Sequence, residues 1–296
     1  MPSLEILPQL VINGLIAGSI YALAASGFSL VYYVIKFLHF AQGATIAIAA
    51  YALFLFANQL GLNSAIAIIF SIIIAVVATL IMNYVVYKPL RKRKATGVVL
   101  LISSLAILTF STSLVRAIFG ASTKTLLLSR QNKSFDFGIF TITLIQLVII
   151  ISAISLFLLL WFIMKKTKLG KAMRALSDNK DVAQIVGISP EKIYTYTFII
   201  VGFFAGISGI LIGLEQNLYP RMSVLIIVKG FISSVIGGIN SVPGAIVGGL
   251  FIGVVENLGI WFLPSGYKDV ISFSILLLFL LFRPNGILGV RMRDDS

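Results

Sequence analysis

The sequence predicts an all-α fold, a polytopic bundle of transmembrane helices. Of its 296 residues, 59% are hydrophobic and only 11% are charged, whereas soluble domains carry about 25% charged residues. Apolar runs of about 20 residues, enough to cross a hydrocarbon core about 30 Å thick, recur along the chain. The net charge of +13 lies in short loops between those runs. The positive-inside rule expects this pattern, so the charge does not indicate a nucleic-acid partner.

The first six predicted spans lie at 11–35, 37–57, 64–87, 98–119, 139–164 and 194–214. The densest basic cluster follows the third span and marks the cytoplasmic side. It consists of Lys88, Arg91, Lys92, Arg93 and Lys94. The loop 120–138 is less biased in charge, so we place it outside. The N-terminus lacks a basic n-region and its apolar run is too long for a signal peptide, so we expect the segment to be retained.

Three apolar segments follow, at 224–239, 242–262 and 270–282. The first is short and contains Lys229. The tail contains the basic residues Arg283, Arg291 and Arg293, which favour a cytoplasmic position. An even number of crossings therefore separates the tail from the cytoplasmic loop 165–192. We therefore predict about 8–9 spans, one of them short or re-entrant, with the N-terminus outside and the C-terminus cytoplasmic.

Residues 165–192, which we call the elbow, form the longest polar interval in the chain. Asp178 or Asn179 can cap a short helix through a side-chain oxygen. Gly187 can end that helix in a left-handed conformation. The Ser-Pro-Glu sequence at 189–191 then predicts the start of another helix. The elbow either docks to a partner or only joins two spans, and its own pattern does not separate these alternatives.

Pairs of glycines spaced four apart predict close helix packing, because small residues on one face let backbones approach. Either intramolecular packing or a subunit interface would explain these pairs. They are Gly14/Gly18, Gly202/Gly206, Gly209/Gly213, Gly244/Gly248 and Gly249/Gly253. The Gly-Gly and Pro-Gly pairs within 237–244 predict a tight turn at a membrane boundary.

Charged and polar residues at membrane depth are functional candidates, because burying them there is costly. Glu256 and Lys229 lie inside predicted spans, while His39, the only histidine, and Gln42 interrupt the apolar run after the first span. These residues either line a translocation path, or Glu256 pairs with Lys229 or a backbone group and holds the bundle together.

Motifs that the sequence lacks exclude several functions. It contains no G-x-x-x-x-G-K-[ST] loop for ATP and no H-E-x-x-H zinc motif, and one histidine cannot form a histidine zinc site. We expect no catalytic residue, metal or cofactor in this chain. It reads as a conduit that something else drives.

Six segments carry motifs in a fixed order: NGLIAGSIYALAASGFSLVY (13–32), FLHFAQG (37–43), RALSDNKDVAQIVGI (174–188), VIGGINSVPGAIVGGLFIGVVENL (235–258), YKDVISF (267–273) and RPNGILG (283–289). Together they resemble the membrane permease subunits of branched-chain amino acid ABC importers, especially the shorter of the two paired permeases. The family's elbow loop has an alanine and a glycine where this chain has Ala183 and Gly187.

Three departures leave the substrate open. His39 stands where the family usually has asparagine, Gln42 where it has histidine, and Asn240 where it has glycine. Importers of urea and short-chain amides share the fold and the motifs and remain an alternative. A standalone secondary carrier, coupled to ions through Glu256 or Lys229, is a second alternative, and a membrane-embedded enzyme has support only from scattered polar groups.

The resemblance implies one permease domain, 1–296, in a bacterial cytoplasmic membrane, with the elbow as its coupling loop. It implies a second permease subunit (a paralogue or another copy), two cytoplasmic ATPases that bind the ATP, and an extracytoplasmic solute-binding protein. Membrane lipid surrounds the chain. The residues expected to couple to the ATPases are Lys171, Arg174, Ala175, Asp178, Asp181, Ala183, Gly187, Gly237, Gly238, Pro243 and Gly244.

Overall fold

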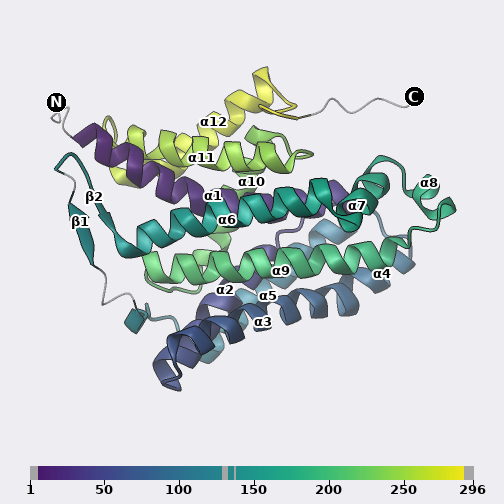
Figure 1. The fold of residues 1–296 in the computed structure, drawn as a ribbon, viewed down its shortest axis with the longest axis horizontal. Helices are drawn as coiled ribbons and strands as arrows, with labels where there is room; N and C mark the ends of the chain where they lie inside the picture. Colours follow the sequence, from purple (N-terminus) through teal and green to yellow (C-terminus); the bar gives the residue numbers. More distant parts are fainter. Residues whose placement is uncertain (1–5, 129–132, 137, 290–296) are drawn as a thin grey trace.

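The computed structural model describes residues 6–128, 133–136 and 138–289. The predicted cytoplasmic residues Arg291 and Arg293 lie outside this part. The described chain is an elongated, almost wholly helical bundle (Figure 1). Seven of its helices are long and apolar enough to cross a membrane, and a shorter apolar helix accompanies them. These features confirm the predicted polytopic bundle.

The long helices run back and forth along the bundle. In chain order they are α1 (Leu7–Ile35), α2 (Gln42–Leu53) with its π-helical continuation η2 (Phe54–Gln59), α3 (Ser64–Ile81) with η3 (Met82–Tyr87) and α4 (Lys88–Lys92), α5 (Gly97–Phe119), α6 (Leu144–Lys166), α9 (Pro190–Glu215), α10 (Met222–Gly237), α11 (Val242–Gly259), and α12 (Lys268–Phe282), which the 3-10 turn η5 (Ser265–Tyr267) precedes. The elbow contains α7 (Lys168–Asp178) and α8 (Lys180–Ile185), and β1 (Ser134–Asp136) pairs antiparallel with β2 (Thr141–Thr143) before α6.

Two spans begin later than the apolar pattern predicted. The second begins at Gln42 rather than at 37, because Lys36 adopts a left-handed conformation (φ 63°) that ends α1. The fifth begins at Leu144 rather than at 139, because β2 comes first and Thr143 then forms a capping box with Gln146. Apolar residues occur in turns and strands as well as in helices, so hydropathy alone does not locate these starts.

The glycine pairs pack inside the chain. Gly14 and Gly18 of α1 lie against Gly253 and Val254 of α11 and their neighbours, so closely that an added Cβ would meet the opposing backbone. The other pairs likewise face neighbouring helices of the same chain: α9 packs against α2 and α3, and α11 against α10. Intramolecular packing is therefore the alternative that the structure supports. Large apolar side chains project outward from α3, α5, α6 and α12, where hydrocarbon would cover them.

The bundle has two distinct ends. At the elbow end, Lys36 Nζ donates to Ser177 Oγ in α7 (3.3 Å), and Ser29 Oγ donates to the Ile239 carbonyl (2.8 Å). At the other end, the hairpin end, an isolated β-bridge joins Lys124 to Leu218. The elbow, the 237–244 turn and the end of α12 thus share one end, as the predicted even number of crossings requires.

Candidate functional site

The elbow begins directly after α6, at a joint held by packing and hydrogen bonds. Thr167 lies at the joint, where its Oγ1 donates to the Ile163 carbonyl (2.6 Å) and accepts from Gly170 N (3.1 Å). A Cβ at Gly170 would collide with the backbone at the end of α6, so only glycine fits there. Met173 and Leu176 of α7 are buried against the bundle. The joint therefore fixes the direction in which α7 leaves the membrane helices.

The short helix α8 forms the tip of the elbow and projects from the bundle (Figure 1). Asn179 supplies its cap, because Oδ1 accepts from Asp181 N and Val182 N (both 3.0 Å). Gly187 closes the turn that follows with φ 87°, as predicted. Beside these, Ile185 is 84% exposed. Val182 and Val186 are also exposed, at 54% and 68%, so the tip presents three apolar side chains that a partner could contact.

The residues predicted to couple to ATPases differ in how accessible they are. Lys171, Asp178, Asp181 and Gly187 are exposed, Arg174 and Ala175 are half-buried, and Ala183 is buried. In the 237–244 turn, Gly237, Gly238 and Gly244 are buried and Pro243 is exposed. The exposed members are therefore the ones that a partner could reach in this conformation.

The 237–244 turn is covered by the C-terminal segment, a relationship that the sequence did not reveal. Ile287 N donates to the Ile236 carbonyl (2.8 Å), and Leu288 N donates to the Gly237 carbonyl (2.9 Å). Gly286, with φ 74°, packs directly on Gly238. Two of the sequence motifs, 235–258 and 283–289, therefore form one unit.

Sequence reasoning also missed an ion pair that anchors the elbow. Arg91 of α4 donates through Nε and Nη2 to the two carboxylate oxygens of Glu191, at 3.2 and 3.1 Å. Arg91 Nη2 also donates to Asn83 (2.8 Å), and its guanidinium lies 4.9 Å from the ring centroid of Tyr194. Ser189 occupies the N-cap position of α9 without a side-chain cap bond. The Arg91–Glu191 ion pair therefore holds the start of α9 more than Ser189 does.

Lys36 provides a second link to the elbow, because its ammonium group reaches Ser177 of α7. Partial burial lowers the pKa of Lys36, and the carboxylate of Asp178 partly opposes that shift. The end of α1 and the start of α9 are thus both tied to the elbow, so a displacement of the elbow would act on two core helices.

His39 lies in the turn between α1 and α2, and Gln42 is the first residue of α2. His39 is fully buried, its Nδ1 is 3.1 Å from the Tyr87 hydroxyl, and its ring packs edge-on against Tyr87 and Phe198. Gln42 Nε2 donates to the Ala24 carbonyl (3.0 Å). Both side chains lie in the interior of the chain, where His39 contacts η3 and α9, and Gln42 joins α2 to α1. Their predicted role in translocation stays a prediction.

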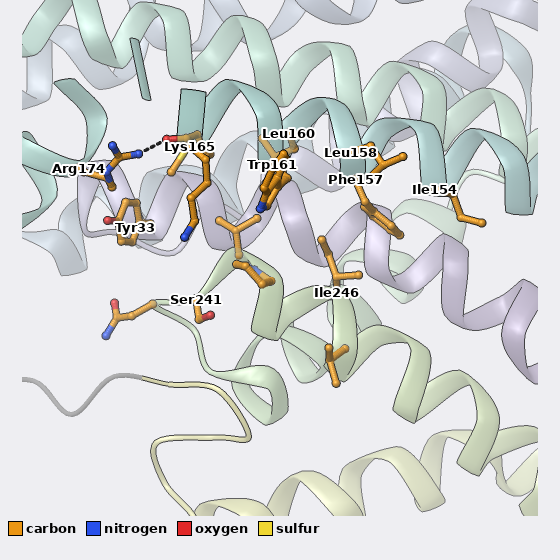
Figure 2. A pocket seen from close by; sticks show the side chains of 15 residues that line it. Tyr33, Ile154, Phe157, Leu158, Leu160, Trp161, Lys165, Arg174, Ser241 and Ile246 are labelled. Atoms are coloured by element: carbon orange, nitrogen blue, oxygen red, sulfur yellow. Dashed lines mark hydrogen bonds between the residues drawn. The ribbon is translucent and has the colours of Figure 1, made fainter. Parts of the chain in front are cut away.

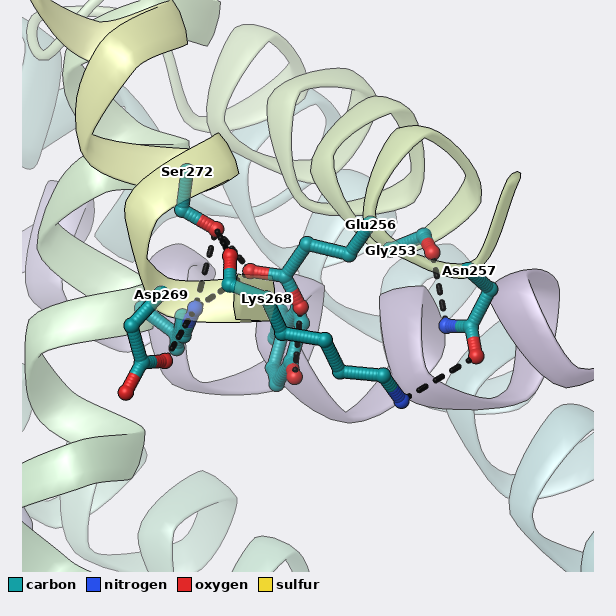
Figure 3. A network of polar contacts seen from close by, with 8 residues as sticks. Gly253, Glu256, Asn257, Lys268, Asp269 and Ser272 are labelled. Carbon is teal, nitrogen blue, oxygen red and sulfur yellow. Dashed lines mark hydrogen bonds and ion pairs between the residues drawn. The ribbon is translucent and has the colours of Figure 1, made fainter. Parts of the chain in front are cut away.

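Lys229 and Glu256 lie in a separate polar cluster that joins α10, α11 and α12 (Figure 3). Lys229 Nζ donates to Glu256 Oε1 and to Ser272 Oγ (2.9 Å), and lies 2.8 Å from Asp269 Oδ1. Tyr21 of α1 donates to Glu256 Oε2 (3.0 Å). The pairing that the sequence offered as an alternative is therefore present. Tyr21, Ser272 and Asp269 are members that the sequence did not reveal.

Together, the fold and these contacts define a polytopic α-helical membrane protein with a capped, helical elbow at one end. A family model described as branched-chain amino acid transport system / permease component matches residues 10–280, and the chain belongs to that family. Its members are transport permeases.

Individual relatives agree with this assignment. The chain is 34% identical to the high-affinity branched-chain amino acid transport system permease protein LivH of Salmonella typhimurium, over 95% of both chains. It is 31% identical to the corresponding permease BraD of Pseudomonas aeruginosa, over 98% of both. Among solved structures, PsaBC from Streptococcus pneumoniae in complex with Fab has a similar fold, with a TM-score of 0.52 and 16% identity over 92% of this chain and 91% of that one.

Proposed function

We propose that this chain is a permease subunit of an ABC importer that carries branched-chain amino acids across a bacterial cytoplasmic membrane. Family membership supports the transport class, and the names of the relatives support the substrate. The observation that carries the mechanism is the elbow, a capped and braced structure whose tip presents apolar side chains. A loop that only joined two spans would need neither the caps nor the exposed patch.

The partner of the elbow is a cytoplasmic ATPase. Val182, Ile185 and Val186 of the tip are 54%, 84% and 68% exposed, and such a helix is suited to an apolar groove on a second protein. Lys171, Asp178 and Asp181 surround them and would set the register. Two ATPases would bind and hydrolyse the ATP, and this chain would contribute no cofactor site of its own.

The elbow transmits the movement of the ATPases to the core. Its first part continues from α6, Lys36 ties α7 to α1, and Glu191 joins the start of α9 to Arg91 of α4. ATP-driven closure of the ATPases would therefore move several helices together. The whole chain acts as one permease domain, with 165–192 as the coupling segment.

In this proposal the elbow end faces the cytoplasm and the N-terminus lies outside. Most of the basic residues that flank the spans lie at the elbow end, whereas Arg116, Arg221 and Lys268 lie at the hairpin end. By the positive-inside rule, this imbalance supports the proposed orientation. A second permease, either a paralogue or another copy, completes the pathway, and an extracytoplasmic solute-binding protein delivers substrate to the hairpin end.

The test is reconstitution of this chain with its neighbouring permease, ATPases and binding protein, followed by uptake of labelled leucine. We expect uptake that requires ATP and that excess urea does not reduce. Gly187→Pro should abolish it, because proline cannot adopt the φ of 87° that closes the tip. Uptake by this chain alone without ATP would contradict the proposal, and uptake of urea but not leucine would contradict the substrate.

A further inference from the structure

A groove of about 680 Å³ opens at the elbow end between α6 and α11, and α1 contributes Tyr33 (Figure 2). Its walls are almost entirely apolar. Ile154, Leu158 and Trp161 come from α6, and Ile246 comes from α11. The apolar walls are therefore built from membrane-spanning helices, while Arg174 of α7 and Ser241 of the 237–244 turn line the elbow end of the groove.

The groove opens on the outer surface of the helix bundle. Ile154, Leu158 and Trp161 are 53%, 62% and 50% exposed, and on a spanning helix such surface meets hydrocarbon. The lining of α6 runs from Ile154 to Lys165. That separation corresponds to roughly 16 Å of helix, about half of a hydrocarbon core of about 30 Å. The groove therefore has the depth of one leaflet.

The elbow end of the groove is cationic. Figure 2 shows Lys165 and Arg174 there, near Tyr33 and Ser241. Arg174 donates one guanidinium N–H to the Met164 carbonyl, which fixes its position and leaves other N–H groups available. All lining residues belong to the described part of the chain, and none of them is acidic. Trp161 lies one helical turn before Lys165, as expected at a membrane interface.

We propose that this groove binds an anionic phospholipid of the cytoplasmic leaflet. An acyl chain lies between α6 and α11, and the headgroup phosphate meets Lys165 and Arg174. Basic pockets between helices on the cytoplasmic side are suited to such headgroups. The proposal rests on the orientation proposed above but not on the transported substrate.

Charge selects this occupant over the alternatives. A free amino acid would bring an ammonium group to a groove whose lining has no carboxylate to pair with it. A zwitterionic lipid would place its own cation beside Lys165 and Arg174. An apolar helix of a second permease would fill the walls but leave both cations without a partner.

The two tryptophans of the chain provide a direct test. In the Trp261→Phe variant, Trp161 is the single reporter, and bromine on a lipid acyl chain quenches its fluorescence on contact. The purified full chain is placed in phosphatidylcholine vesicles that contain equal fractions of brominated phosphatidylglycerol or brominated phosphatidylcholine. We expect brominated phosphatidylglycerol to bind at the groove at least about fivefold more tightly, because each of the two basic contacts supplies about that factor.

Charge variants show whether the preference arises in the groove. Lys165→Glu should abolish the preference, and Lys165→Arg should retain it. Lys180→Glu makes the same charge change at the elbow tip and should leave the preference intact. In the Trp161→Phe variant, Trp261 at the hairpin end should report no preference.

Equal quenching by the two lipids, or a preference that survives Lys165→Glu, would overturn the proposal. Loss of quenching when the second permease is co-reconstituted would also overturn it, because a protein helix would then occupy the groove. The readout involves neither ATP nor substrate, so its failure is distinguishable from a failure of the proposed transport function.

Discussion

Arg91 and Glu191 form a two-point ion pair across 100 residues of sequence, with nitrogen–oxygen distances of 3.1 and 3.2 Å. Arg91 ends the third span, and Glu191 lies in the first turn of α9, directly after the elbow. The Arg91 side chain is only 10% exposed, whereas that of Glu191 is 38% exposed. The pair fixes the point at which the elbow re-enters the membrane bundle.

Arg91→Lys should therefore weaken coupling more than folding. Lysine keeps the charge but cannot reproduce the forked contact with the two carboxylate oxygens. Because Glu191 is partly solvated, we expect a loss of only about 1 kcal/mol in stability, but a clear drop in leucine uptake per ATP hydrolysed. Thermal unfolding in detergent and coupled uptake assays measure the two effects. Lys92→Arg, next along the chain, is the matched control, and unchanged coupling in Arg91→Lys would contradict the role of the pair.

The Lys229–Glu256 pair predicts an asymmetric effect of single substitutions. Lys229→Met leaves the buried Glu256 carboxylate without its cation, which should cost about 3–5 kcal/mol. Glu256→Gln should cost less, because Lys229 keeps Asp269 at 2.8 Å. The Lys229→Met/Glu256→Gln double variant should recover much of the stability lost in Lys229→Met.

Uptake by the double variant separates the two roles that the sequence left open. We expect it to transport, because partners within the chain already satisfy these charges. A double variant that folds but does not transport would instead place the pair in the translocation path.

Ile185→Asp should abolish binding of the ATPases without unfolding the permease. The side chain is 84% exposed, so a carboxylate there stays solvated and the effect on stability should be within about 0.5 kcal/mol. Co-purification with tagged ATPase measures the loss. Ala183→Asp should behave differently, because Ala183 is buried and the change would unfold the tip. Retention of the ATPases by Ile185→Asp would show that they dock elsewhere.

Gly249→Ala should destabilise the bundle by about 1–3 kcal/mol, the usual cost of overpacking. An added Cβ would lie 2.5 Å from the Ala22 backbone, and backbone cannot move aside as a side-chain end can. Gly266→Ala is the control, because nothing lies within 4 Å of a Cβ there. Melting temperatures in one detergent compare the two, and equal values would contradict the close packing of α1 on α11.

The sequence by itself determined the class of the protein, most of its spans, an elbow cap at Asp178 or Asn179, and the closing turn at Gly187. The structure then showed that Asn179 is the cap. These features depend on local properties. Hydropathy over about 20 residues selects a membrane helix, and the conformational preferences of asparagine and glycine act within one turn. The order of the motifs also predicted the family that the comparisons show.

Only the tertiary structure decided which residues meet. It brought Arg91 to Glu191, Tyr21 to Glu256, and the 283–289 segment to the 237–244 turn, and it separated His39 from Lys229 into different clusters. In an apolar chain nearly every segment suits a membrane, so composition does not specify neighbours. Neighbours depend on where small residues let two helices approach and where a buried charge finds its partner, and both are properties of the assembled bundle.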